Sequence, residues 1–239
     1  MNGIVAAGFF QNIYDAFYRA TISEDRYLFF IDGLKVTIMV SFFAILLGVA
    51  IGLIVAVVKV ASANNKKLWI LNKICNLYTT VIRATPVIVQ LLILNNLVFT
   101  SRDSNLIMVA SLCFGINSGA YVAEIIRAGL ESVDKGQMEA GRSLGFTYIQ
   151  TMRLIIIPQA IKNILPALGN EFITLIKETS VAGVIALTDV TKAAQYIGSV
   201  TFDPLPPLFV SAIIYLVMVL GLTKLLGIFE RRLAQGDHN

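Results

Sequence analysis

The sequence predicts an all-helical integral membrane protein with five transmembrane helices, its N-terminus outside and its C-terminus in the cytoplasm. Of the 239 residues, 56% are hydrophobic and 14% are charged, and the mean hydropathy is +0.76. Soluble domains carry about 25% charged residues, so this composition suits a surface that faces lipid better than one that faces water. Apolar runs of about 20 residues, the length that crosses the hydrocarbon core, recur along the chain.

The chain is expected to fold as one domain, because no Pro-, Gly- or Ser-rich linker divides it. No basic cluster precedes an apolar core before Arg19, so a cleaved signal peptide is not expected. Phe9, Ile13 and Phe17 share one helical face, which indicates a short interfacial helix, although an aromatic belt around the first span explains them nearly as well. Three parts are expected: an N-terminal interfacial helix or tail (1–27), a transmembrane domain (28–232) and a cytoplasmic tail (233–239).

Five segments are apolar and long enough to be the spans. The first is an uncharged run between Lys35 and Lys59, and the second is interrupted by Arg83 and Pro86. The fourth is less apolar than the others, and the fifth opens with several prolines. In chain order the expected spans cover residues 36–58, 73–99, 106–126, 161–187 and 205–229.

The distribution of lysine and arginine sets the predicted orientation, because cytoplasmic loops carry an excess of both. Alternation of five spans places twelve basic residues inside: Lys59, Lys66, Lys67, Lys73, Arg127, Lys135, Arg142, Arg153, Lys162, Lys224, Arg231 and Arg232. Five lie outside: Arg19, Arg26, Lys35, Arg102 and Lys192. This imbalance predicts that the loop between the third and fourth spans is cytoplasmic.

That loop is predicted to form a helix, a tight glycine turn and a second helix. Asp134 can cap the first helix, and Gly145 can end it. Thr147 with Gln150 is the capping pattern of a second helix, whose far end is limited by Pro158. A compact element of this kind is not needed to cross the membrane, which indicates that it binds another protein.

The loop resembles that of permease subunits of ATP-binding-cassette (ABC) importers, whose signature is Glu-Ala-Ala, a glycine four residues on, and an Ile-x-Leu-Pro run. The matching residues here are Glu139, Ala140, Gly141, Arg142, Ser143, Leu144, Gly145 and the run that ends at Pro158. Two departures occur, since Gly141 replaces the second alanine and Ile157 replaces the leucine.

The resemblance extends from about residue 30 to residue 232 and is to the polar amino-acid branch of these permeases, the histidine, glutamine, arginine and cystine type. The segments that carry it are 83–86 with Gln90, 120–129, 158–160, 165–173 and 177–180. It implies the type I ABC importer fold, in which the Glu139–Pro158 loop is the coupling element that docks on the ATPase.

The same resemblance implies the partners of the chain. Such permeases pair as homo- or heterodimers in the inner membrane, sit on two ATP-binding subunits and receive a polar amino acid from an external binding protein. The chain has no Gly-x-x-x-x-Gly-Lys-Ser/Thr loop, so ATP and magnesium are expected on the partner ATPase, with no cofactor or enzymatic activity here. Nucleic acid is not expected as a partner, because the basic residues lie in short loops beside apolar segments.

Polar residues within the spans are candidates for the substrate site, because charges in hydrocarbon usually face a partner, a cavity or a pathway. At about 1.5 Å per residue, Asn117 lies about 16 Å along the third span and Arg83 about 15 Å along the second. We expect Glu124 to bind the ammonium of a zwitterionic amino acid and Arg83 its carboxylate. The expected substrate-binding residues are Arg83, Gln90, Asn117, Ser118, Tyr121 and Glu124.

Structural roles compete with these assignments. Arg83 and Glu124 can instead pair with each other or with backbone carbonyls. Glu171, Lys177 and Glu178 in the fourth span are expected to act in helix packing or gating rather than in substrate contact.

Several other residues are expected to be structural or inert. Gly48 and Gly52 form a small-x-x-x-small pair that allows close helix packing. Cys75 and Cys113 lie in apolar stretches with no metal-ligand spacing, and His238 sits in the polar tail, so no metal site is expected.

Three other classes of protein fit the sequence less well. An ion-coupled secondary amino-acid transporter is the main alternative, because it too would place charges at mid-membrane, but it predicts internal repeats that the chain lacks. A membrane-embedded enzyme would need a nucleophile, base or metal cluster, and a purely structural scaffold would not need the capped loop.

Overall fold

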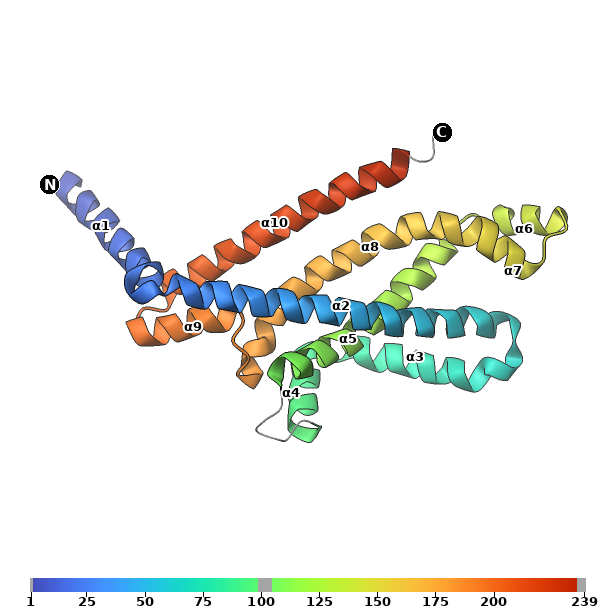
Figure 1. Cartoon of the computed structure of the whole chain (residues 1–239), viewed down its shortest axis with the longest axis horizontal. Helices are drawn as coiled ribbons and strands as arrows, with labels where there is room; N and C mark the ends of the chain where they lie inside the picture. Colours follow the sequence, from blue (N-terminus) through green and yellow to red (C-terminus); the bar gives the residue numbers. More distant parts are fainter. Residues whose placement is uncertain (1, 99–104, 236–239) are drawn as a thin grey trace.

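The computed structural model describes residues 2–98 and 105–235, and every regular element in these ranges is a helix, which confirms the all-α class. The long helices α2, α8 and α10 run along the long axis of the molecule, with α6 and α7 at one end and α1 and α9 at the other (Figure 1). The α-helices are α1 Asn2–Thr21, α2 Tyr27–Asn64, α3 Trp69–Ala84, α4 Val87–Leu97, α5 Leu106–Glu131, α6 Lys135–Ser143, α7 Tyr148–Thr151, α8 Ile157–Glu178, α9 Val190–Thr201 and α10 Leu205–Gln235.

Shorter helical turns complete the chain: Ser23–Asp25 (η1), Lys66–Leu68 (η2), the π-helical turn Met152–Ile156 (η3) and Thr179–Ile185 (η4). The predicted end of the second span at residue 99, the prediction for Arg102, and those for His238 and residues 236–239 of the tail fall outside the described residues. The side chain of Phe9 is not described.

Three helical segments of the described chain are long and apolar enough to cross a membrane: Ser23–Ser62, Leu106–Glu131 and Leu205–Leu233. The pair 66–84 and 87–97 adds a fourth if it is counted as one span, although the two helices are bent by 108°. The predicted fourth span, residues 161–187, is not among them: α8 ends at Glu178, and the rest of the span falls on η4 and the residues after it. The count of five and the orientation of the termini therefore stay predictions.

Close packing of α2 against α5 forms the centre of the helix bundle. A Cβ at Gly48 would lie 2.9 Å from Ser118 Oγ, and one at Gly52 would lie 2.5 Å from Val122 Cγ1. Both distances are shorter than real Cβ contacts, so only glycine lets the two helices approach this far. The predicted packing role of the glycine pair is confirmed.

Asp189 fixes α9 against its neighbours. Its carboxylate caps α9 by accepting hydrogen bonds from the backbone amides of Thr191 at 3.1 Å and Lys192 at 2.9 Å, and it is 1% exposed. It also accepts one from the hydroxyl of Tyr215 on α10 at 3.0 Å. Its carbonyl oxygen faces Gly33 of α2, where a Cβ would lie 2.7 Å away. One residue therefore holds α9 between α2 and α10.

The change Asp189→Ala is expected to lower the free energy of unfolding by about 2–3 kcal/mol, because it removes the helix cap and leaves buried donors without an acceptor. Asp189→Asn keeps one oxygen acceptor and should cost about 1 kcal/mol. Denaturant unfolding in detergent micelles, followed by circular dichroism, measures both. Wild-type stability of Asp189→Ala would show that the carboxylate does not fasten α9.

Candidate functional site

The bend between α3 and α4 occurs at Pro86, as the interruption of the second span predicted. Proline has no amide hydrogen, so the carbonyl of Ile82 loses its helical donor. The side-chain amide of Gln90 replaces it, donating to Ile82 O at 2.8 Å and to Thr85 Oγ1 at 2.7 Å. The Oε1 atom of Gln90 accepts a hydrogen bond from Asn117 Nδ2 on α5 at 3.0 Å. Gln90 and Asn117 thus stabilise the break and attach it to α5.

Ser118, beside Asn117 on α5, connects this helix to α8. It is fully buried, and its hydroxyl donates to Glu171 Oε1 at 2.7 Å. Asn117 is also buried, with 4% of its surface exposed. The geometry therefore gives Gln90, Asn117 and Ser118 roles in holding helices together, and their contact with a substrate stays a prediction.

Glu124 lies at the centre of a cluster of cations. Its Oε1 is 2.8 Å from Lys59 Nζ on α2, and its Oε2 is 2.9 Å from Arg127 Nη2 on its own helix. Lys59 also donates to Thr79 Oγ1 on α3 at 3.1 Å, so this cluster joins three helices. Arg127 continues the chain of charges to Glu131, at 2.6 Å.

Lys59 and Arg127 are site residues that the sequence reasoning missed, since it treated both as the charged ends of spans. The spacing of Arg127, one helical turn after Glu124, is a signal that could have found it. Lys59 is 65 residues from Glu124 in the chain, and no sequence pattern joins the two.

Arg83 is the cation of this group that is held least tightly by Glu124. The structural alternative, a direct pair with Glu124, is only loosely formed, because Arg83 Nη1 lies 3.9 Å from Glu124 Oε2. The guanidinium is 5.3 Å from the ring centroid of Tyr121, within the range of a cation–π contact. Its side chain is 44% exposed, whereas that of Glu124 is 21% exposed.

Arg83, Tyr121 and Glu124 share an open cleft of about 480 Å³ with one face of α8. The other residues that line it are Ile125, Ala128, Ala167, Asn170, Glu171 and Thr174. A second cleft, of about 460 Å³, lies on the other side of Arg83 and Glu124 and is lined by Lys59, Asn76, Thr79, Thr80 and Ala84. The structure therefore brings together three of the six predicted substrate residues and adds Glu171.

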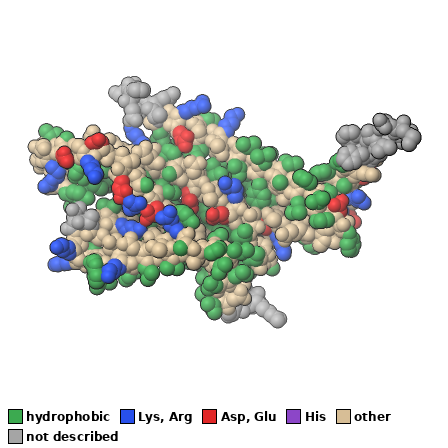
Figure 2. Space-filling model, turned by 180° about the vertical axis from the view of Figure 1, so that it is seen from behind, with side chains coloured by type: hydrophobic (Ala, Val, Ile, Leu, Met, Phe, Trp, Pro, Cys, Tyr) green, Lys and Arg blue, Asp and Glu red, His purple; other side chains and the backbone are tan. Residues whose placement is uncertain are grey.

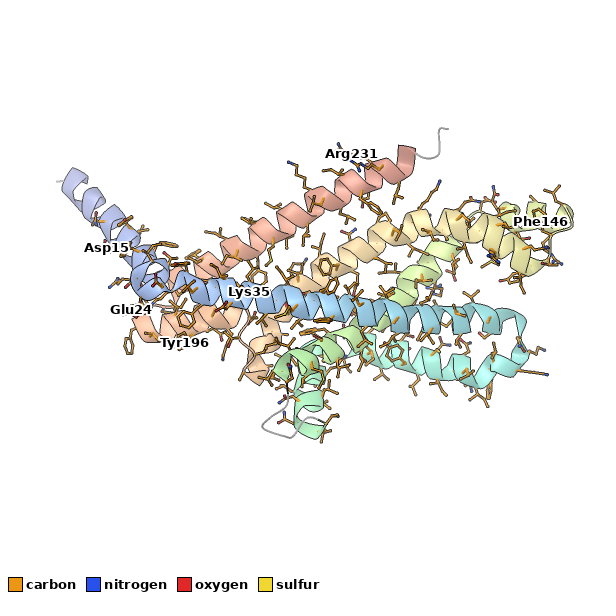
Figure 3. All side chains as sticks on the ribbon, viewed as in Figure 1. Asp15, Glu24, Lys35, Phe146, Tyr196 and Arg231 are labelled. Atoms are coloured by element: carbon orange, nitrogen blue, oxygen red, sulfur yellow. The ribbon has the colours of Figure 1, made fainter. Side chains whose placement is uncertain are left out.

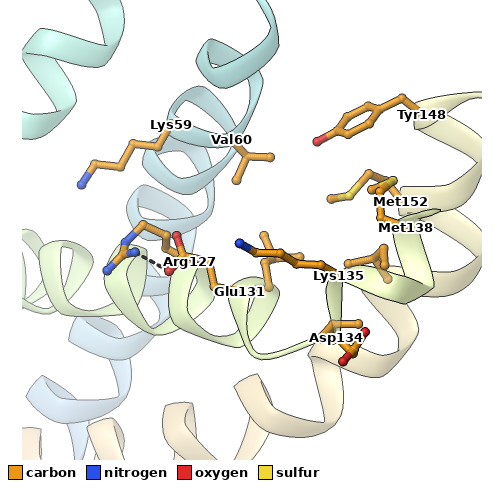
Figure 4. A pocket seen from close by; sticks show the side chains of 12 residues that line it. Lys59, Val60, Arg127, Glu131, Asp134, Lys135, Met138, Tyr148 and Met152 are labelled. Carbon is orange, nitrogen blue, oxygen red and sulfur yellow. Dashed lines mark hydrogen bonds and ion pairs between the residues drawn. The ribbon is translucent and has the colours of Figure 1, made fainter.

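A larger cavity, of about 630 Å³, lies between the ends of α2 and α5 and the loop helices (Figure 4). Lys59 and Val60 line it on one side and Tyr148 and Met152 on the other, and Arg127 lies on the same side as Lys59 (Figure 4). It is also lined by Glu131, Lys135 and Met138. The ion pairs around Glu124 thus reach the space beside the predicted coupling element.

The loop has the predicted form of helix, glycine turn and helix. The prediction that Pro158 limits the second helix was wrong: α7 continues through the π turn η3 into α8. Pro158 lies in the first turn of α8, where a missing amide hydrogen is tolerated. Asp134 caps α6 through Gly136 N at 2.6 Å, and the Thr147–Gln150 capping box begins α7. Gly145 has a φ of +86°, and Phe146 N donates to Gly141 O at 3.1 Å, which closes the end of α6 as a Schellman turn.

Helix packing explains why Gly141 stands in place of the second alanine. A Cβ there would lie 2.6 Å from Thr151 Cγ2 and 3.1 Å from Ile155 Cδ1, so glycine lets α6 lie directly on α7 and η3. The turn presents large apolar side chains to solvent, since Leu144 is 77% exposed and Ile149 is 75% exposed. Figure 3 places Phe146 at the opposite end of the molecule from Tyr196 on α9, so this apolar surface projects from the bundle.

Among the described residues, no group of three or more His, Cys, Asp and Glu side chains is placed to hold a metal ion. Cys113 is buried and Cys75 is partly exposed, and both are free thiols.

Residues 45–235 match the family model of the binding-protein-dependent transport system inner membrane component. The arginine transport system permease protein ArtQ of Bacillus subtilis (strain 168) is 38% identical over 92% of this chain and 98% of its own length. The glutamine transport system permease protein GlnP of Escherichia coli (strain K12) is 34% identical over 85% of this chain and 92% of its own length.

Two solved structures have a similar fold. A crystal structure of an amino acid ABC transporter with histidines is 46% identical, with a TM-score of 0.81 over 88% of this chain and 97% of that chain. The MetNI methionine ABC transporter in an inward-facing conformation gives a TM-score of 0.74 over 88% of this chain and 99% of that chain, at 18% identity.

Proposed function

Because the chain belongs to the family of binding-protein-dependent transport system inner membrane components, we propose that it forms the membrane pathway for a polar amino acid. It is a permease subunit of an amino-acid ABC transporter, with the type I importer fold. Arginine and glutamine, named for two relatives, share the zwitterionic backbone and a polar side chain, which supports a polar substrate. No observation favours the alternative of an ion-coupled secondary transporter.

The complex proposed for this chain has three further kinds of subunit. Two ATP-binding subunits hold ATP and magnesium and dock on the α6–α7 loop, whose exposed Leu144 and Ile149 offer an apolar contact surface. A second permease chain completes the pathway, and an extracytoplasmic binding protein delivers the amino acid. The assembly lies in the cytoplasmic membrane.

The observation that carries the substrate site is the cleft shared by α3, α5 and α8. Arg83 is its exposed cation, and a guanidinium binds a carboxylate through two parallel hydrogen bonds. We assign the substrate carboxylate to Arg83 and its ammonium to Glu171, which accepts its hydrogen bond from the neutral Ser118 hydroxyl. Glu124 is already held by Lys59 and Arg127, so its role is to keep those cations in place beside the cleft.

Arg83→Met is expected to weaken the apparent affinity for transported substrate by about 10- to 150-fold, because a hydrogen bond to a charged group contributes about 1.5–3 kcal/mol. The protein should fold normally, since the closest Arg83 contact to Glu124 is 3.9 Å. Uptake of a panel of labelled amino acids by proteoliposomes that hold the whole complex measures this.

Two variants control the experiment. Arg83→Lys keeps the charge but not the fork of donors and should lose less affinity. Arg231→Met removes an exposed arginine of α10 (Figure 3) that does not line the cleft, and it should transport normally. Wild-type uptake by Arg83→Met at normal protein levels would remove Arg83 from the substrate site.

A further inference from the structure

A long stretch of the chain carries only one sign of charge. Between Asp32 and Asp103 there is no acidic residue, whereas the same seventy positions hold seven lysines and arginines. Three of the seven, Lys66, Lys67 and Lys73, lie at the turn where α2 passes through η2 into α3. This turn is at the same end of the molecule as α6 and α7 (Figure 1).

These three lysines differ from their neighbours in having no anion beside them. Lys35 pairs with Asp32 at 2.8 Å, and Lys59 pairs with Glu124 at 2.8 Å. Within the described part of the chain, Lys66, Lys67 and Lys73 form no ion pair, and all three are exposed. Figure 2 shows this end of the molecule from behind, with Lys and Arg side chains on its surface. Their charge is therefore available to an external anion.

An apolar surface adjoins the lysines. Trp69 is 58% exposed, and its ring lies 4.0 Å from Lys73 Nζ. Ile70, Ile74 and Leu77 follow at helical spacing along α3 and are 63%, 58% and 65% exposed. A tryptophan with lysines at one end of an exposed apolar helix face is the pattern of a membrane–water interface.

We propose that the α2–α3 turn binds an anionic phospholipid, with the phosphodiester headgroup on Lys66, Lys67 and Lys73 and the acyl chains along the exposed apolar face of α3. The three lysines supply charge complementarity to a phosphate. The apolar face that begins next to them fits the hydrocarbon part of the same molecule, which an acidic protein surface would leave uncovered. An anionic phospholipid therefore matches both parts of the surface, the three lysines and the apolar face of α3.

The chain contains its own probe, because Trp69 is its single tryptophan. The full-length chain is reconstituted into bilayers of phosphatidylcholine that contain brominated phosphatidylglycerol or, in parallel, brominated phosphatidylcholine, and quenching of Trp69 fluorescence is compared. Phosphatidylglycerol is expected to bind the site at least about fivefold more tightly than phosphatidylcholine does. This factor corresponds to about 1 kcal/mol, the contribution of one basic residue near an anionic headgroup. The preference should shrink at 0.5 M salt, which is about the range where exposed charges are screened.

The variant Lys66→Gln/Lys67→Gln should lose most of the preference while keeping the Lys73–Trp69 contact. Its matched control, Lys224→Gln/Arg231→Gln, removes two exposed cations from α10 and should keep the preference. Equal quenching by the two brominated lipids in the wild type would overturn the proposal. Absence of quenching by either lipid would also overturn it, because a protein surface would then cover Trp69. Neither result depends on Arg83, so this test is independent of the proposed substrate site.

Discussion

Replacing Glu124 by glutamine is expected to lower the free energy of unfolding by about 2–4 kcal/mol and to abolish uptake. Glu124 and Lys59 side chains are 21% and 11% exposed, and the change leaves the lysine without its anion. Breaking a buried ion pair by removing one partner costs about 3–5 kcal/mol, and the partial exposure of Glu124 reduces that figure. The loss of uptake follows because the cations beside the cleft are no longer held in place.

A double-mutant cycle separates this effect from a role of Glu124 in substrate contact. Lys59→Met with Glu124→Gln removes both charges and should recover at least about 1 kcal/mol of the lost stability. The control is Glu131→Gln, which breaks the exposed pair with Arg127 and should cost less than about 1 kcal/mol. Unfolding in detergent and uptake in proteoliposomes are both measured. Glu124→Gln with wild-type stability but weakened substrate affinity would return Glu124 to the ammonium site that the sequence predicted.

Replacing Gly145 by valine is expected to uncouple the permease from its ATP-binding subunits and to reduce uptake to the background level. Gly145 has a φ of +86°, where a β-branched residue is strained. Nothing lies within 4 Å of a Cβ at this position, so the effect comes from the backbone and not from a clash. The strained turn no longer sets the angle between α6 and α7, and the surface formed by Leu144 and Ile149 changes shape.

Two matched variants test that explanation. Gly145→Asn can adopt positive φ and should keep most of the uptake. Gly221→Val places the same side chain in open space on α10, at a glycine without positive φ, and should transport normally. Co-purification of the ATP-binding subunits with each variant reports docking, and uptake reports coupling. The docking role of this loop would be refuted if Gly145→Val docked and transported as well as Gly145→Asn does.

The features that depend on local chemistry could be predicted from the sequence. Composition and apolar run length are enough to identify a membrane protein, because lipid selects for both. The capped loop could be predicted because caps and glycine turns involve residues only a few positions apart, as Asp134, Gly145 and Thr147 show. The break at Pro86 could be predicted for the same reason, since proline acts on its own turn.

The polar residues that face each other could not be predicted, because their contacts depend on how the helices pack. Asn117, Tyr121 and Glu124 follow one helical spacing, yet Asn117 is buried against Gln90 while Tyr121 and Glu124 line the cleft. The partner of Glu124 on α2 lies far away in the chain, so helix packing, not spacing, brings Lys59 to it.

The role of Gly141 also depends on helix packing. Glycine has a lower helix propensity than the alanine it replaces, so the sequence alone gives no reason for it. In the structure a Cβ at this position would lie 2.6 Å from Thr151 Cγ2, so only glycine fits. A single sequence records which side chains each helix carries, but not the distance of closest approach between helices. That distance decides whether a polar group meets a partner, a cavity or nothing, and it is fixed only when all the helices pack together.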